Sequence, residues 1–525
     1  MNRIHQHFAM TLGLCLLSAS LSGCATGPRQ WIANGFKVGP NYGQPPAPVA
    51  AQWIDHQDPS LECVPADYSY WWAVFNDPIL NNLVQQASEQ NLPLKIAAMR
   101  IVEARAQLGV AKGSLFPQQQ QAIGGYSRSQ LSTTSFPFGE FVLPKIAFDT
   151  WTAGFDAAWE LDFWGRFRRA VESADANLSA QIENHDDVLV MLQAEVAATY
   201  IQIRTLEDRL ALARRNVELQ RNTLRISTAR YEEGHVGKVD VKQAESIVGA
   251  TESLIPMLET AHRQAQNRLW TLLGMPPADI RAMLGEPGRI PVAPPTVAVG
   301  IPADLICRRP DIRRAERQAA AQCARIGVAE SELYPHIAIR GTIAFESQYL
   351  DQLFMTDSLM GSVGPGFRWN ILNYGRILNN VEVEDARFRQ LVLQYQETVL
   401  RANEEVEGAI TAFLRERVRE KILEASTQAT AEAVDLSGMQ YKEGLIDFQR
   451  VLDSERALVV QQDALAESRG KVALNLVAVY KALGGGWRTR LNPHGLLEPV
   501  PPELSDETPA NDAEKPAGPE SIAGK

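Results

Sequence analysis

The chain has 525 residues, of which 22% are charged, with a mean hydropathy of −0.18 and a net charge of −11 at pH 7. The acidic balance argues against a nucleic-acid partner, because phosphate backbones attract basic surfaces. No stretch after the N-terminus approaches the roughly 18 continuous apolar residues of a transmembrane helix. The sequence contains no His-Glu-x-x-His, Walker or Gly-x-Ser-x-Gly motif. We therefore predict that the protein is not an enzyme and holds no metal.

Residues 1–23 have the pattern of a secretory signal peptide. A basic start precedes an apolar run from Phe8 to Leu17, which is too short to span a bilayer permanently. The run leads into Leu21-Ser-Gly-Cys24, which resembles the lipobox of bacterial lipoproteins. This resemblance implies a covalent lipid on Cys24 and no other cofactor. The alternative is an ordinary signal peptide that a different peptidase removes.

Three cysteines remain beyond Cys24, namely Cys63, Cys307 and Cys323. An odd number of thiols leaves at least one unpaired in an oxidising compartment. Cys307 and Cys323 could form a bridge, but the sequence supplies no geometry for it. We interpret the three thiols as structural.

The first part of the mature chain, residues 24–70, is rich in Pro, Gly, Gln and Ala and predicts an extended arm. Apolar residues at helical spacing begin near Pro78, and a second helical stretch ends before Pro117. The period then changes to two over about 118–163, which predicts a pair of strands.

A very long helix follows the strands. The stretch 166–233 contains neither Gly nor Pro, so it predicts one helix of on the order of 100 Å. Gly234 can end it in the left-handed conformation, and a return helix is expected over 239–273. No globular core needs a helix of this length, so it must pack along others in a coiled-coil-like array.

The same plan occurs twice. Tyr231-Glu-Glu-Gly234 matches Tyr441-Lys-Glu-Gly444 at an offset of 210 residues, and matches further upstream are offset by 218. Two copies of one unit are therefore expected, repeat 1 over 71–275 and repeat 2 over 303–484. Repeat 2 has a strand pair at about 336–372, a long helix at 376–443 and a return helix at 447–483. A linker at 276–302 joins the repeats, and we expect a disordered tail over 485–525.

The four predicted strands are about 10 residues long, enough to cross a bilayer when tilted. Their alternation is equally compatible with soluble half-buried hairpins. Four strands cannot close a barrel, and open sheet edges are not tolerated in lipid, so several copies would have to share one barrel. A ring of identical chains would then form an outer-membrane pore joined to a periplasmic conduit of helices.

Ordered motifs across most of the mature chain resemble those of TolC-like outer-membrane efflux channels, and most closely their OprM/NodT-type lipoprotein branch. The motifs are Val38-Gly-Pro-Asn-Tyr42, Trp71-Trp-Ala-Val-Phe-Asn-Asp-Pro78, Trp159-Glu-Leu-Asp-Phe-Trp-Gly-Arg166, Pro302-Ala-Asp-Leu-Ile-Cys-Arg-Arg-Pro310 and Val451-Leu-Asp453. The resemblance implies a mixed α/β membrane protein, a homotrimer whose 12-stranded β-barrel takes four strands per chain and continues as a long periplasmic α-helical barrel.

The same resemblance implies partners and a role. The partners would be a periplasmic adaptor protein and an inner-membrane pump, of the RND type, and the chain would be a passive exit duct for drugs or other small toxic compounds. Two alternatives stay open, an outlet for type I protein secretion and a periplasmic coiled-coil lipoprotein without a pore.

The candidate functional residues lie at the helix turns. The resemblance places an acidic constriction at Asp453, where three copies around the axis would attract cations. Asp240 and Arg450 occupy equivalent positions in the two repeats, so we hypothesise that they pair, within a chain or between chains, and hold the periplasmic end closed. Phe448 could narrow the aperture or simply pack between helices.

The two Tyr-x-x-Gly turns are the second candidate. Tyr231 with Gly234 and Tyr441 with Gly444 end the long helices, and the resemblance adds docking of the adaptor at both turns. Plain helix termination is the alternative role for these residues.

Overall fold

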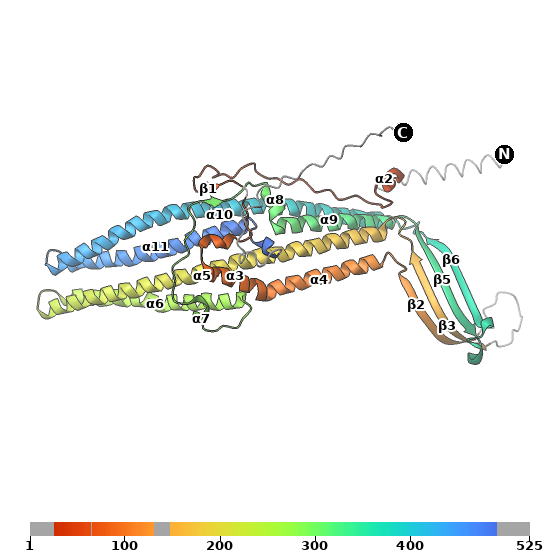
Figure 1. Cartoon of the computed structure of the whole chain (residues 1–525), viewed down its shortest axis with the longest axis horizontal. Coiled ribbons are helices and arrows are strands. Elements are labelled where there is room, and N and C mark those ends of the chain that lie inside the picture. The colour runs from red at the N-terminus through yellow and green to blue at the C-terminus, as the bar shows by residue number, and fades with distance from the viewer. Residues whose placement is uncertain (1–25, 65, 131–146, 491–525) are drawn as a thin grey trace, which may run out of the picture.

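The computed structural model describes residues 26–64, 66–130 and 147–490 of the chain. The molecule is elongated, with a sheet at one end and the turns of paired helices at the other (Figure 1). The expected signal peptide, Cys24 and the tail beyond residue 490 lie outside the described residues. Within the described ranges, no helix combines the length and the apolar character needed to cross a membrane.

The helices of the two repeats match in length. Helices α5 (Arg166–Glu232) and α10 (Arg376–Lys442) have 67 residues each, and α6 (Lys238–Leu272) and α11 (Phe448–Ala482) have 35 each. Helices α4 (Leu92–Gly113) and α9 (Pro310–Ser331) have 22 each. The offset is 210 residues for the first two pairs and 218 for the third, as the sequence predicts. The fold therefore contains the expected internal duplication.

Glycines end the long helices in the same way in both repeats. Gly234 has φ 81° and Gly444 has φ 76°, a region that costs residues with a side chain about 1–2 kcal/mol. The amide of His235 donates to the carbonyl of Arg230 at 2.8 Å, and the amide of Leu445 donates to that of Gln440 at 2.9 Å. These bonds define the helix-ending motif that glycine favours. Each long helix thus turns back into its partner within five residues.

A four-stranded antiparallel sheet forms the other end of the molecule. Its strands are β2 (Gln119–Gln130), β3 (Ala147–Glu160), β5 (His336–Ser347) and β6 (Leu359–Arg368), in the order β2-β3-β5-β6. Two short helices, η2 (Leu350–Gln352) and η3 (Thr356–Ser358), connect β5 to β6. Strand β6 ends four residues before the prediction, because the chain turns there toward Gly375 at the start of α10.

The register of the sheet separates polar from apolar side chains. Phe155 pairs with Ile343, and the adjacent Asp156 pairs with Thr342, whose hydroxyl donates to the carboxylate at 2.6 Å. Phe155 and Ile343 are 69% and 64% exposed. An uncovered apolar face opposite a hydrogen-bonded polar face is the pattern of strands that lie between lipid and water.

The arm and the linker meet around the middle of the long helices, and we call this region the belt. Strand β1 (Leu61–Glu62) of the arm pairs in parallel with β4 (Val297–Ala298) of the linker. The arm is extended over most of its length, but it begins with a short helix, α2 (Pro28–Ala33), that the sequence analysis did not predict. The folded chain also extends past residue 485, where η4 (Trp487–Arg490) packs into the belt. The thiols of Cys63, Cys307 and Cys323 are free.

The main core lies at this belt. Trp53 of the arm is 2% exposed, and the indole of Trp71 stacks on Tyr480 with ring centroids 5.6 Å apart. The remaining short helices pack around it: η1 (Trp71–Phe75), α3 (Pro78–Gln90), α7 (Arg281–Leu284) and α8 (Asp304–Arg308).

The long helices lie side by side in a fixed order. Between the belt and the turns the order is α6, α5, α11, α10, and between the belt and the sheet it is α4, α5, α9, α10 (Figure 1). Helix α10 is therefore one edge of the chain, and α4 and α6 form the other.

Candidate functional site

We call the end of the molecule opposite the sheet the tip; it consists of the turns 233–237 and 443–447 and the helix ends beside them (Figure 1). All the candidate residues except Cys24 lie there. Tyr231 is 42% exposed, whereas its repeat partner Tyr441 is 5% exposed. Equivalent residues of the two repeats thus have different surroundings within one chain.

Tyr441 is held by an arginine of the other repeat. The guanidinium of Arg230, near the end of α5, donates to the carbonyl oxygen of Tyr441 and lies 4.6 Å from the centroid of its ring. A charge-assisted bond and a cation–π contact thus act on the same residue. The sequence analysis missed Arg230. A comparison of the two repeats could have singled it out, because the equivalent position of repeat 2 is the uncharged Gln440.

Phe448 packs beneath Tyr441, with ring centroids 5.0 Å apart. It is 4% exposed and belongs to a small apolar cluster at the tip. The cluster comprises Ala244, Ile247, Tyr441, Phe448, Val451 and Leu452. In the single chain the ring of Phe448 therefore supports the helix ends and faces no open passage.

Asp240 and Arg450 form no ion pair in the described part of the single chain. Asp240 is half-buried near Tyr441, and Arg450 is exposed. Burial raises the pKa of the Tyr441 phenol, Arg230 opposes this shift, and the charge of Asp240 adds to it. The pairing of Asp240 with Arg450 therefore stays a prediction for the contact between neighbouring chains.

Asp453 is exposed one turn beyond Gln449 on α11. The amide of Gln449 donates to its carboxylate at 2.9 Å, and Arg456 lies 3.3 Å from the same oxygen. These partners hold the carboxylate in place without burying it. Its charge is therefore accessible to ions, as an acidic constriction requires.

Between the tip and the belt, polar side chains line the contact between α5 and α11. Thr223 donates to the carboxylate of Glu455 at 2.5 Å, and the guanidinium of Arg209 makes two bonds to Asp463, at 2.7 and 2.9 Å. Glu455 is 2% exposed, and burial raises the pKa of its carboxyl group. The bond to Glu455 is buried and the Arg209–Asp463 pair is partly exposed, and together they fix the register of the two helices.

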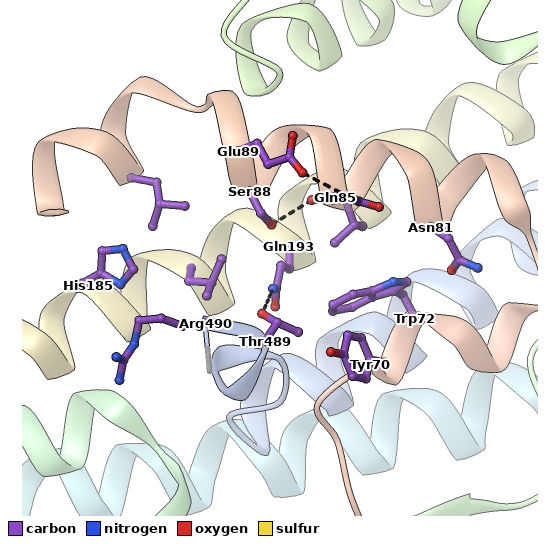
Figure 2. Close-up of a pocket in the computed structure, with 13 residues that line it drawn as sticks. Tyr70, Trp72, Asn81, Gln85, Ser88, Glu89, His185, Gln193, Thr489 and Arg490 are labelled. Atoms are coloured by element: carbon purple, nitrogen blue, oxygen red, sulfur yellow. Dashed lines mark hydrogen bonds between the residues drawn. The ribbon is translucent and has the colours of Figure 1, made fainter. Parts of the chain in front are cut away.

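A separate pocket of about 190 Å³ opens at the belt, between α3, α5 and η4 (Figure 2). The amide of Gln193 donates to Thr489 at 3.1 Å at its base, and Trp72 forms part of its wall. Its lining mixes apolar side chains such as Val84 and Leu189 with polar ones such as His185 and Arg490, and no sequence motif indicated it. Within the described ranges, no group of three or more His, Cys, Asp or Glu side chains is placed to hold a metal ion.

A sheet with one apolar and one polar face, continued by a rod of paired helices, is the architecture of an outer-membrane channel subunit. Residues 83–275 and 301–485 match the family model described as "Outer membrane efflux protein". The chain belongs to this family.

Individual relatives agree with this assignment. Nodulation protein T of Rhizobium leguminosarum bv. trifolii is 31% identical over 87% of this chain and 96% of that protein. The pyoverdine export outer membrane protein OpmQ of Pseudomonas aeruginosa is 28% identical over 81% of this chain and 89% of that protein. The solved structure of the outer-membrane channel OprN is 30% identical, with a TM-score of 0.80 over 86% of this chain and 99% of that chain.

These likenesses confirm the recognised family, the predicted fold class and the location in the outer membrane with a periplasmic extension. The chain is an outer-membrane efflux channel protein. Members of this family are ducts and not enzymes, and they work with adaptor and inner-membrane pump proteins.

Proposed function

We propose that three copies of this chain form the passive exit duct of a tripartite pump for small toxic compounds. One observation carries the proposal: the four-stranded sheet has two open edges, β2 and β6, together with an uncovered apolar face. Unpaired strand edges are not stable in lipid, so neighbouring sheets must close the ring. Three copies would supply the 12 strands that the family resemblance implies.

The partner of the duct would be a periplasmic adaptor bound at the tip, with an inner-membrane pump of the RND type behind it. The two Tyr-x-x-Gly turns are the adaptor-docking candidates, because they present Tyr231 and the glycines at the exposed end. The relatives named for nodulation and for pyoverdine export have similar identities to this chain. On this proposal the pump, and not the duct, would select the cargo.

The gate would be formed by the tip. Asp453 would provide a ring of three carboxylates, and Arg230 would hold Tyr441 and its helix end in the closed state. Phe448 would act as a positioning residue beneath Tyr441. Asp240 and Arg450 would pair between neighbouring chains. Cys24 would carry the lipid that anchors the arm.

Two measurements test the function. The purified protein should give stepwise conductance in a planar bilayer, and deletion of its gene should sensitise cells to several small toxic compounds. A protein without conductance would contradict the duct and favour the lipoprotein without a pore. Unchanged susceptibility together with loss of a secreted protein would favour the secretion outlet.

A further inference from the structure

The polar face of the sheet carries two arginines. Asp156 and Thr342 define this face, because they lie directly opposite each other on β3 and β5 and share a hydrogen bond. Side chains two residues apart in a strand point to the same side, so Arg340 belongs to this face. Ser362 of β6 lies opposite Thr342, and Arg368 follows it on the same side. In the proposed ring of copies this face lines the lumen, because the apolar face meets lipid.

Both guanidiniums are exposed and unpaired. Among the residues that the structure describes, neither Arg340 nor Arg368 makes an ion pair or a side-chain hydrogen bond. Arg368 ends β6 and lies opposite His336, the first residue of β5, so it marks the end of the sheet that joins the helices (Figure 1). Arg340 lies four residues along β5, about 13 Å further into the sheet.

The acids on the same face are occupied or distant. Asp156 and Glu160 lie diagonally across the strands from Arg340. Asp156 accepts the hydroxyl of its cross-strand partner at 2.6 Å, and Glu160 binds Arg166 at 3.2 Å. Glu346 lies six residues beyond Arg340 on β5, at about 20 Å. The two free guanidiniums are therefore available to a ligand.

Repeat 2 has fewer acids and more bases than repeat 1 at this end of the sheet. The equivalent positions, written with repeat 1 first, are Asp156 with Gly366, Glu160 with Asn370, Ala122 with Arg340, and Ala158 with Arg368. The unpaired positive charge therefore belongs to the second strand pair.

Closing the ring supplies no acid from the adjacent strand. Strand β6 is an open edge of the sheet, so in the proposed ring it lies beside β2 of the next copy. Strand β2 contains neither Asp nor Glu. Arg368 therefore stays without a carboxylate on the strand that joins it.

We propose that Arg340 and Arg368 of the assembled copies form an oxyanion-binding site in the lumen, at the end of the sheet that joins the helices, where cargo that carries a group such as a carboxylate binds on its way out. Because the lumen exists only in the ring of copies, this site rests on the proposed function. It adds a basic zone to the acidic one at Asp453.

The chemistry and the space at this position fit such a ligand. A guanidinium presents parallel N–H donors that match the two oxygens of a carboxylate. Rings of basic side chains line pores that take up anions, and low-dielectric walls strengthen their attraction. Gly364 lies directly opposite Arg340, and a Cβ built at Gly364 or Gly366 meets no atom within 4 Å. A small ligand therefore has room beside the guanidiniums.

Block of single channels by citrate tests the site. At constant ionic strength, citrate should lower the conductance of the wild-type protein. Arg340→Gln/Arg368→Gln should raise the citrate concentration for half-block at least tenfold and leave block by the cation spermidine unchanged. Arg128→Gln removes a positive charge from the opposite face of the sheet, where Asp149 already pairs with it at 3.3 Å, and should leave the half-block concentration unchanged.

A second pair of variants keeps both arginines. Gly366→Asp places the carboxylate that repeat 1 has at Asp156 two residues before Arg368 and diagonally across from Arg340. It should neutralise the site and raise the half-block concentration as the double arginine variant does. Gly366→Asn has the same size without the charge and should keep the wild-type block.

The outcomes separate this site from the proposed function. Absence of conductance in the wild-type protein would overturn the duct. Conductance without citrate block, or the same half-block concentration in the wild type and in Arg340→Gln/Arg368→Gln, would overturn the oxyanion site while the duct stands. If the double variant does not reach the membrane, equal half-block concentrations in Gly366→Asp and Gly366→Asn would overturn the site.

Discussion

Arg230 and Tyr441 join the two repeats of the chain at the tip, where the guanidinium of Arg230 binds the carbonyl oxygen of Tyr441 and covers its ring at 4.6 Å. The repeat partners Gln440 and Tyr231 cannot form the same charged contact. The contact therefore breaks the internal symmetry where the gate is proposed.

Removing this arginine should open the tip. Hydrogen bonds to charged groups contribute about 1.5–3 kcal/mol, so Arg230→Ala should raise the ratio of open to closed channels by about 10- to 100-fold. Single-channel recording measures the ratio. Tyr441→Phe keeps the ring and the carbonyl oxygen and should change it little. An unchanged ratio in Arg230→Ala would show that the contact does not hold the closed state.

Asp453→Asn should weaken cation selectivity. Three neutral side chains would replace three accessible charges at the narrow part of the duct, so the reversal potential in a KCl gradient should move toward zero. Asp435→Asn removes an exposed carboxylate on α10 and is the control. A change of equal size in both variants would mean that general surface charge, and not a constriction at Asp453, sets the selectivity.

The proposed pairing of Asp240 and Arg450 predicts a coupled effect. Asp240→Arg and Arg450→Asp should each raise leakage of a large antibiotic, because each places like charges together, and the double swap should restore the barrier. Additive leakage in the double variant would exclude the pairing.

Glu455 should make stability depend on pH. Burial raises its pKa in the folded state, so the ionised carboxylate lowers stability above that pKa and the penalty disappears as the pH falls through it. Glu455→Gln should therefore raise Tm by a few degrees at pH 7.5, and the difference should vanish near pH 4. If Glu455→Gln raised Tm by the same amount at all pH values, the gain would come from better packing and not from removal of the ionised carboxylate.

The turn glycines should be intolerant of a side chain. Gly444→Ala should lower the free energy of unfolding by about 1–2 kcal/mol, because φ is 76° there. Gly438→Ala lies inside α10 with open space around it and should raise the free energy by about 0.5–1 kcal/mol. Chemical denaturation measures both. A stable Gly444→Ala would mean that the turn adopts another conformation.

The sequence predicted the ends of elements best where the signal comes from residues close together in the chain. Continuous runs without Gly or Pro, ended by Gly234 and Gly444, placed α5 and α10 to within one residue of their observed ends. Strand ends were less well placed, since alternation continues past Arg368 although β6 stops there. The helix α2 is only 6 residues long and carries no periodic pattern to detect.

By itself, the sequence determined the duplicated plan, the family and the positions of the tip turns, because helix periodicity, helix-ending glycines and a constant offset are all properties of residues near one another in the chain. The tertiary structure decided which of two equivalent residues is buried. Tyr231 and Tyr441 begin the same Tyr-x-x-Gly pattern, and the sequence does not show that Phe448 packs against Tyr441. The burial of Tyr441 depends on a side chain some 200 residues away, that of Arg230, and so only packing could reveal it.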